Sequence, residues 1–179
     1  TRQINRIGAR LFALYAWSVF ALFAVPTYIS ACLPLPLAQR WCLARLSAKF
    51  AASLVLSKAR FEGEENLPKD GAPAVLVINH QSYLDGPIAF ALLPKLARFM
   101  IKADLGSSWL LRVPLQRLGM LFIERFNAAG GFDGLKTAAD TLQRGHTIAM
   151  FPEGTFRRMP GLLPFRMGPF ALAAQCQVP

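Results

Sequence analysis

The sequence predicts an α/β protein with a largely parallel or mixed sheet and flanking helices, preceded by an N-terminal membrane-embedded segment of two helices. Three observations lead to this prediction. Residues 1–58 are apolar and basic, without one acidic side chain. From residue 59 onward, short apolar runs alternate with segments of helical spacing, which is typical of a parallel sheet. Several of these runs end in charged or titratable residues, and ligands bind at that edge of such sheets.

The chain has 179 residues, enough for an α/β domain of residues 59–179 behind an N-terminal helical hairpin of residues 1–58. Its net charge is +10, and residues 1–58 contribute seven basic and no acidic side chains, against 13 basic and 10 acidic ones in the remainder. Charge and apolarity together favour an anionic membrane surface as a partner. No nucleic-acid partner is predicted, because such proteins normally interleave aromatic and basic residues on a polar face.

The N-terminal segment allows three interpretations. Residues 11–28 carry no charge and are long enough to cross a hydrocarbon core. Pro26, Pro34 and Pro36 are expected to interrupt this helix, and an amphipathic helix over residues 37–56 follows. A signal peptide is disfavoured because the stretch is long and has no clear cleavage site. A single spanning helix stays open, but we prefer a hairpin dipping into one leaflet of the cell membrane, with both basic ends on the cytoplasmic face.

The remaining elements follow in order behind a polar, turn-rich entry at residues 61–71. Apolar runs predict four strands, and the segments between them have the spacing and the turn residues of helices. The expected strands cover residues 74–78, 98–101, 120–123 and 147–151. The expected helices cover residues 87–93, residues 105–118 with a bend or break at Pro114, residues 132–142 closed by Gly145, and residues 165–175.

His80 follows the first of these strands, and Asp85 comes five residues later across a turn. An imidazole at a strand end with a carboxylate returning towards it is the pattern of a general base and its orienting group. The alternative is structural: His80 ends the strand, and Asp85 caps the helix that begins near Pro87.

Two other strand ends carry polar groups. Glu153, Gly154 and Thr155 follow the strand at 147–151 and can set side chains and backbone N–H groups against a polar ligand. Arg157 comes next, and a guanidinium can bind phosphate through two hydrogen bonds. The structural alternative is a tight turn with solvated arginines. Lys102 and Glu124-Arg125 follow the strands at 98–101 and 120–123, so all of these groups are expected at one edge of the sheet.

In these motifs the chain resembles the glycerolipid acyltransferases, among them the 1-acyl-glycerol-3-phosphate (lysophosphatidate) acyltransferases, over about residues 60–179. The matching residues are Asn79, His80 and Asp85 in the first motif, Phe122, Ile123, Glu124 and Arg125 in the second, and Phe151, Pro152, Glu153, Gly154 and Thr155 in the third. Many members place arginine directly after that threonine, whereas Phe156 stands here. The fourth motif of the family would begin near Val178-Pro179, so we expect a C-terminally truncated domain.

The resemblance implies transfer of an acyl chain from acyl-CoA or acyl carrier protein to the hydroxyl of lysophosphatidate. In this scheme His80 is the base and Asp85 orients it. Backbone N–H groups near Gly154 or the turn at His80 stabilise the oxyanion. Substrate contacts are expected from Asn79, Lys102, Arg125, Glu153, Gly154, Thr155 and Arg157. Neither a metal nor a cofactor is expected, because there is no metal-ligand spacing, and no Gly-x-Ser-x-Gly motif indicates an acyl-enzyme.

Three alternatives stay open at the level of sequence. The same chemistry could serve glycerol 3-phosphate or another lysophospholipid. From another class, the chain could be a non-catalytic membrane lipid-binding module, although such a module has no need of the His80–Asp85 pair. A lipid hydrolase would use water as the acceptor.

Overall fold

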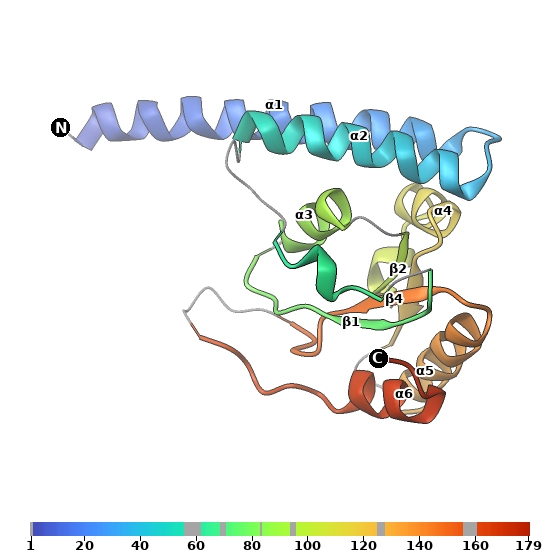
Figure 1. The fold of residues 1–179 in the computed structure, drawn as a ribbon. Helices are drawn as coiled ribbons and strands as arrows, with labels where there is room; N and C mark the ends of the chain where they lie inside the picture. Colours follow the sequence, from blue (N-terminus) through green and yellow to red (C-terminus); the bar gives the residue numbers. More distant parts are fainter. Residues whose placement is uncertain are drawn as a thin grey trace.

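The computed structural model of the chain describes residues 2–55, 62–68, 71–82, 84–93, 96–124, 128–155 and 161–179. Within these residues, two long helices pack as an antiparallel hairpin over one side of an α/β layer (Figure 1). The hairpin consists of α1 (Arg2–Cys32) and α2 (Leu37–Val55). The helices of the α/β layer are α3 (Asp85–Leu92), α4 (Trp109–Arg117), α5 (Ala128–Gln143) and α6 (Gly168–Cys176).

Among the described residues, the sheet contains four strands in the order β1-β4-β2-β3, and each neighbouring pair is parallel. The strands are β1 (Val75–Val77), β2 (Ala97–Lys102), β3 (Leu121–Ile123) and β4 (Thr147–Met150). All four predicted strands are therefore present, and the parallel prediction is confirmed. Every residue of β4 is buried, as expected for a central strand covered on both faces. Since the strands are parallel, their carboxyl ends lie at one edge.

One hydrophobic cluster joins the hairpin to the sheet. Trp41 of α2 packs against Phe90 of α3 with ring centroids 4.3 Å apart and the rings tilted by 39°, and both belong to a cluster that includes Phe99 of β2. The Trp41 indole N–H donates to the carbonyl of Leu118 at 2.9 Å, which ties α2 to the end of α4. The division at residues 58 and 59 falls outside the described residues and stays a prediction.

A second cluster covers the opposite face of the sheet. Ala138 and Leu142 of α5 and Leu172 of α6 pack there against Met100 and Ile148. Gly145 ends α5 with φ of +81°, and its N–H donates to the Leu142 carbonyl. The left-handed conformation is the reason that glycine closes this helix, as the sequence predicted. The chain then enters β4 directly.

Three predicted boundaries were wrong. Pro26 lies inside α1 and does not interrupt it. A proline removes one helical hydrogen bond, but packing of α1 along α2 over many residues outweighs that local loss. The segment expected as one helix over residues 105–118 begins as a 3₁₀ turn, Ala103–Gly106, and α4 then runs through Pro114 without a break. The last helix begins at Gly168 and not at Phe165, because residues 161–166 are extended and hydrogen-bonded across the sheet edge.

Candidate active site

His80 and Glu153 meet because their strands are neighbours. His80 follows β1 and Glu153 follows β4, and these two strands pair in parallel from Val75 and Ile148 onward. The Ile78 N–H also donates to the Met150 carbonyl at 2.9 Å, so the pairing continues past the end of β1. The sheet therefore brings two motifs 73 residues apart in sequence into direct contact.

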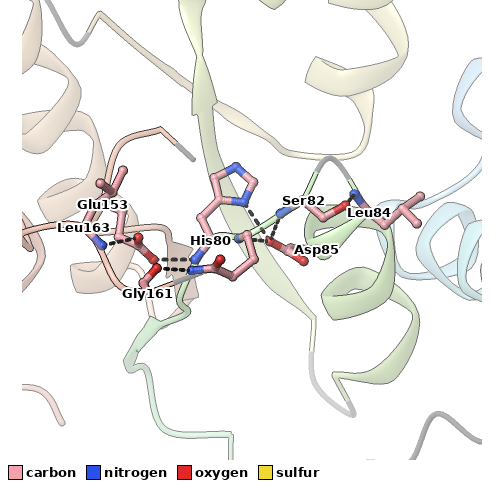
Figure 2. A network of polar contacts seen from close by, with 8 residues as sticks. His80, Ser82, Leu84, Asp85, Glu153, Gly161 and Leu163 are labelled. Carbon is pink, nitrogen blue, oxygen red and sulfur yellow. Dashed lines mark hydrogen bonds and ion pairs between the residues drawn. The ribbon is translucent and has the colours of Figure 1, made fainter. Parts of the chain in front are cut away.

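His80 and Asp85 form the predicted pair. The Nδ1 atom of His80 lies 2.9 Å from Oδ2 of Asp85, and both side chains are largely buried. Asp85 is the first residue of α3, so the turn between β1 and α3 returns the carboxylate to the ring. Figure 2 shows the other ring nitrogen, Nε2, pointing away from the residues drawn.

The environment of Asp85 favours its ionised form. Burial by itself raises the pKa of Asp85. The hydrogen bonds from the His80 ring and from the N–H groups of Ser82 and Gln81, together with the positive charge of His80, outweigh burial and hold the pKa below its usual value. An ionised carboxylate can only accept, so the hydrogen bond between His80 and Asp85 requires a proton on Nδ1 of His80. When the ring is neutral, Nε2 therefore presents a lone pair. This is the tautomer that a general base at Nε2 requires.

The capping alternative for Asp85 was wrong. Its Oδ2 accepts from the N–H groups of Gln81 at 2.6 Å and Ser82 at 2.8 Å, both of which precede α3. A capping side chain would instead accept from the first turn of the helix that follows. The carboxylate therefore closes the turn around His80 and fixes the ring.

Glu153 occupies a buried position behind His80, with only 4% of its surface exposed. One oxygen accepts from the backbone N–H of His80 at 2.6 Å, and the other accepts from the N–H of Leu163 at 2.8 Å (Figure 2). The sequence predicted substrate contact for Glu153, but in this structure both of its oxygens hold protein backbone. Its geometry supports a positioning role, since it joins three loops at the sheet edge.

Phe151 places the histidine beside a pocket. The rings of His80 and Phe151 lie 4.4 Å apart between centroids, and Phe151 also lines a cavity of about 210 Å³. The cavity wall is mostly apolar, with Glu124 and Arg166 as its charged members among the described residues. It is lined by Met100, Ile123, Glu124, Gly131, Leu135, Met150, Phe151, Pro152, Gly154, Arg166, Gly168 and Pro169. An apolar pocket with a few polar groups beside a histidine and its carboxylate partner is a typical binding site.

The other predicted residues that the structure describes lie along the same edge. Asn79 and Thr155 are exposed and follow β1 and β4. Lys102 ends β2 and forms an ion pair with Asp104. Gly154 lines the pocket with φ of +70°. Arg125 and Arg157 lie outside the described residues.

Four of the backbone N–H groups near Gly154 and His80 already donate to other acceptors. The Gly154 N–H donates to the Phe151 carbonyl at 3.0 Å. The His80 N–H binds Glu153, and those of Gln81 and Ser82 bind Asp85. These four N–H groups are bound to carboxylates and a carbonyl in this structure, and stabilisation of an oxyanion by backbone N–H groups near Gly154 or the turn at His80 stays a prediction.

Sequence reasoning missed three residues of this site. The side-chain amide of Gln81 donates to the Gly161 carbonyl at 2.8 Å, and Leu163 contributes the N–H that Glu153 binds. Arg166 lies in the pocket wall. All three residues act through the extended residues 161–166. The sequence assigned only residues 165 and 166 of this segment, to the last helix, and gave no signal that the segment is fixed at the site. The described residues include no group of three or more His, Cys, Asp or Glu side chains placed to hold a metal ion.

Comparisons with known proteins agree with this geometry. A model of the protein family described as Acyltransferase matches residues 58–179. The chloroplastic 1-acyl-sn-glycerol-3-phosphate acyltransferase LPAT1 of Arabidopsis thaliana is 33% identical over 121 residues, which are 68% of this chain and 34% of that protein. A Chlamydomonas reinhardtii 1-acyl-sn-glycerol-3-phosphate acyltransferase is 29% identical over 192 residues, covering 98% of this chain and 55% of its own length.

A solved structure has the same fold. The crystal structure of the 1-acyl-sn-glycerophosphate acyltransferase PlsC from Thermotoga maritima matches with a TM-score of 0.71 and 23% identity, over 100% of this chain and 73% of the other. The chain spans about a third of the length of the plant relatives it matches. Because the family model covers more than half of the chain, including the motifs around His80 and Glu153, the chain belongs to the acyltransferase family.

Proposed function

We propose that the protein transfers a fatty acyl chain from acyl-CoA or acyl carrier protein to the free hydroxyl of lysophosphatidate and so forms phosphatidic acid. The observation that carries this proposal is the His80–Asp85 pair, 2.9 Å apart, at the sheet edge beside an apolar pocket. The names of the relatives support the choice of lysophosphatidate as acceptor.

The proposed reaction is one direct displacement. Nε2 of His80 takes the proton of the acceptor hydroxyl as its oxygen attacks the thioester carbonyl. Asp85 keeps the ring in the required tautomer and stabilises the imidazolium that forms. When the tetrahedral intermediate collapses, the C–S bond breaks, and the imidazolium returns its proton to the leaving thiolate. Asn79, Lys102, Thr155, Arg125 and Arg157 remain proposed substrate contacts.

The hairpin is proposed to hold this site at the cytoplasmic face of the cell membrane. Among the described residues, one helical stretch, Ile7–Cys32 of α1, is long and apolar enough to cross a membrane. Its side chains are mostly exposed, as are four apolar residues of α2. The exposed apolar positions include Leu11, Phe12, Leu14, Trp17, Phe20, Val25 and Ile29 of α1, and Leu43, Leu46, Phe50 and Leu54 of α2. Such a surface suits the headgroup and acyl boundary of a bilayer.

The arrangement of the helices favours a hairpin that lies in one leaflet over a single spanning helix. Figure 1 shows α1 and α2 side by side, with α2 resting on α3. The phenol of Tyr15 donates to the Leu54 carbonyl at 2.8 Å, so α1 is attached to the far end of α2 as well. If α1 crossed the bilayer along its normal, α2, which packs along α1, and the α/β layer, which packs on α2, would also lie in the hydrocarbon.

An acyl-transfer assay tests the proposed function. Purified protein in lipid vesicles is given labelled palmitoyl-CoA or palmitoyl carrier protein together with lysophosphatidate, glycerol 3-phosphate or lysophosphatidylcholine. We expect labelled phosphatidic acid, formed fastest from lysophosphatidate. Release of free fatty acid without an acceptor product would indicate a hydrolase, and lipid binding without any product would indicate a non-catalytic module. Either result contradicts the proposal.

A further inference from the structure

Residues 161–166 form an extended strap across the carboxyl ends of β1 and β4. The Leu163 N–H donates to Oε2 of Glu153 at 2.8 Å, and the Arg166 N–H donates to the Pro152 carbonyl at 2.9 Å. Both acceptors belong to the motif that follows β4. These hydrogen bonds fix the backbone of the strap and so hold Arg166 at the candidate site.

The side chain of Arg166 packs on Gly154. A Cβ atom at Gly154 would lie 2.8 Å from Nε of Arg166 and 3.3 Å from its Cδ. Gly154 also has φ of +70°, which favours glycine. Absence of a side chain at Gly154 thus leaves the space in which the guanidinium lies, and this accounts for glycine in the motif independently of any hydrogen bond from its N–H.

Arg166 brings positive charge to an otherwise apolar wall. It is the only cation among the described residues that line the pocket. The other charged member, Glu124, lies against Gly130, where an added Cβ would approach Oε2 to 2.6 Å. Gly130 is in the first turn of α5, and the exposed N–H groups of a helix start stabilise a carboxylate. Glu124 therefore lies against the start of α5, and Arg166 is an exposed residue that lines the pocket and packs on Gly154.

We propose that Arg166 binds the phosphate group of the acceptor, an inference that rests on the proposed function. In lysophosphatidate the phosphate is attached to the glycerol carbon next to the one that carries the free hydroxyl. A cation that binds it must therefore lie near the base, and Arg166 shares the pocket with Phe151, whose ring contacts His80. A guanidinium matches phosphate oxygens through paired hydrogen bonds.

Kinetics of Arg166→Ala test this assignment. We expect the KM for lysophosphatidate to rise about 10- to 100-fold, the range for loss of a hydrogen bond to a charged group. The KM for the acyl donor should stay within about twofold of the unmodified protein, within the scatter of energetically neutral changes. Arg166→Lys should recover part of the loss, since lysine keeps the charge without the planar fork. The control is Arg144→Ala, an exposed arginine after α5 at the opposite edge of the sheet, which should leave both KM values unchanged.

A phosphate-free acceptor separates recognition from general damage. The rate at which monoacylglycerol is acylated should be the same for Arg166→Ala and for the unmodified protein, because monoacylglycerol has no phosphate group for Arg166 to bind. An unchanged KM for lysophosphatidate, or a rise in the donor KM alone, would overturn the role of Arg166 while leaving the proposed function intact. If the unmodified protein does not acylate lysophosphatidate, the proposed function fails and this inference fails with it.

Discussion

Replacing Glu153 by glutamine tests how the site is held together. The carboxylate accepts backbone N–H groups of His80 and Leu163 at 2.6 and 2.8 Å and is nearly inaccessible to solvent. Glutamine has almost the same shape, but only one of its two terminal atoms accepts. One backbone N–H must therefore face an NH₂ group inside the protein.

The expected loss follows from that count. A buried donor left without an acceptor costs about 1–3 kcal/mol. For a chain of this size, 2 kcal/mol corresponds to a fall of about 4–8 °C in melting temperature. Because the mispaired N–H belongs to His80 or to the strap, we expect the His80 ring, the proposed base, to shift as well, and a misplacement of about 1 Å can lower kcat about 100-fold.

Thermal melting and acyl-transfer kinetics measure both effects. The matched control is Asp140→Asn, the same change of charge at an exposed position of α5, which should leave melting temperature and kcat unaltered. If the Glu153→Gln protein has the same melting temperature and the same kcat as the unmodified protein, the positioning role of Glu153 is refuted.

Four further predictions concern charge and the membrane. Asp85→Asn should lower kcat about 100- to 10,000-fold, as expected for loss of the base's orientation. The pKa of Asp85 is held below its usual 3.8, so the ionised Asp85 stabilises the folded protein fully above about pH 4, and this contribution disappears as the pH falls through the lowered pKa. The melting temperature of the unmodified protein should therefore fall on acidification, and that of Asp85→Asn should fall less. Burial and the charges of Arg98 and Arg144 lower the pKa of His146, so Arg144→Ala should raise that pKa towards 6.5 in an NMR titration, and an unchanged titration would contradict the stated contribution of charge. Trp17→Glu should weaken flotation with anionic vesicles, whereas Asp140→Asn should not; equal flotation of both would argue against α1 as the contact.

Much of the fold could be predicted because its strands are short apolar runs bounded by turn residues. The contact of His80 with Asp85 could be predicted as well, since a five-residue turn brings the two together. The insertion of β4 between β1 and β2 could not, because strand order depends on how helices pack over the sheet. The continuity of α1 through Pro26 likewise depends on α2, which local sequence does not report.

The roles of Glu153 and Arg166 illustrate the remaining gap. Sequence placed Glu153 at a strand end, where a substrate contact and a buried link look alike. Only burial and the two N–H partners separate them. The sequence assigned Arg166 to the start of the last helix. Its position depends instead on the hydrogen bond from its backbone N–H to Pro152, 14 residues earlier, which local sequence does not report.

Single-turnover acyl transfer by His80→Ala tests the central claim most directly. The variant protein, with lysophosphatidate and labelled palmitoyl-CoA in vesicles, should form phosphatidic acid about 100- to 10,000-fold more slowly than the unmodified protein, the usual loss for a positioned base. Its melting temperature and vesicle flotation should remain close to those of the unmodified protein, so that the loss reports chemistry. Near-normal turnover by a folded, membrane-bound His80→Ala protein would contradict the assignment of His80 as the base.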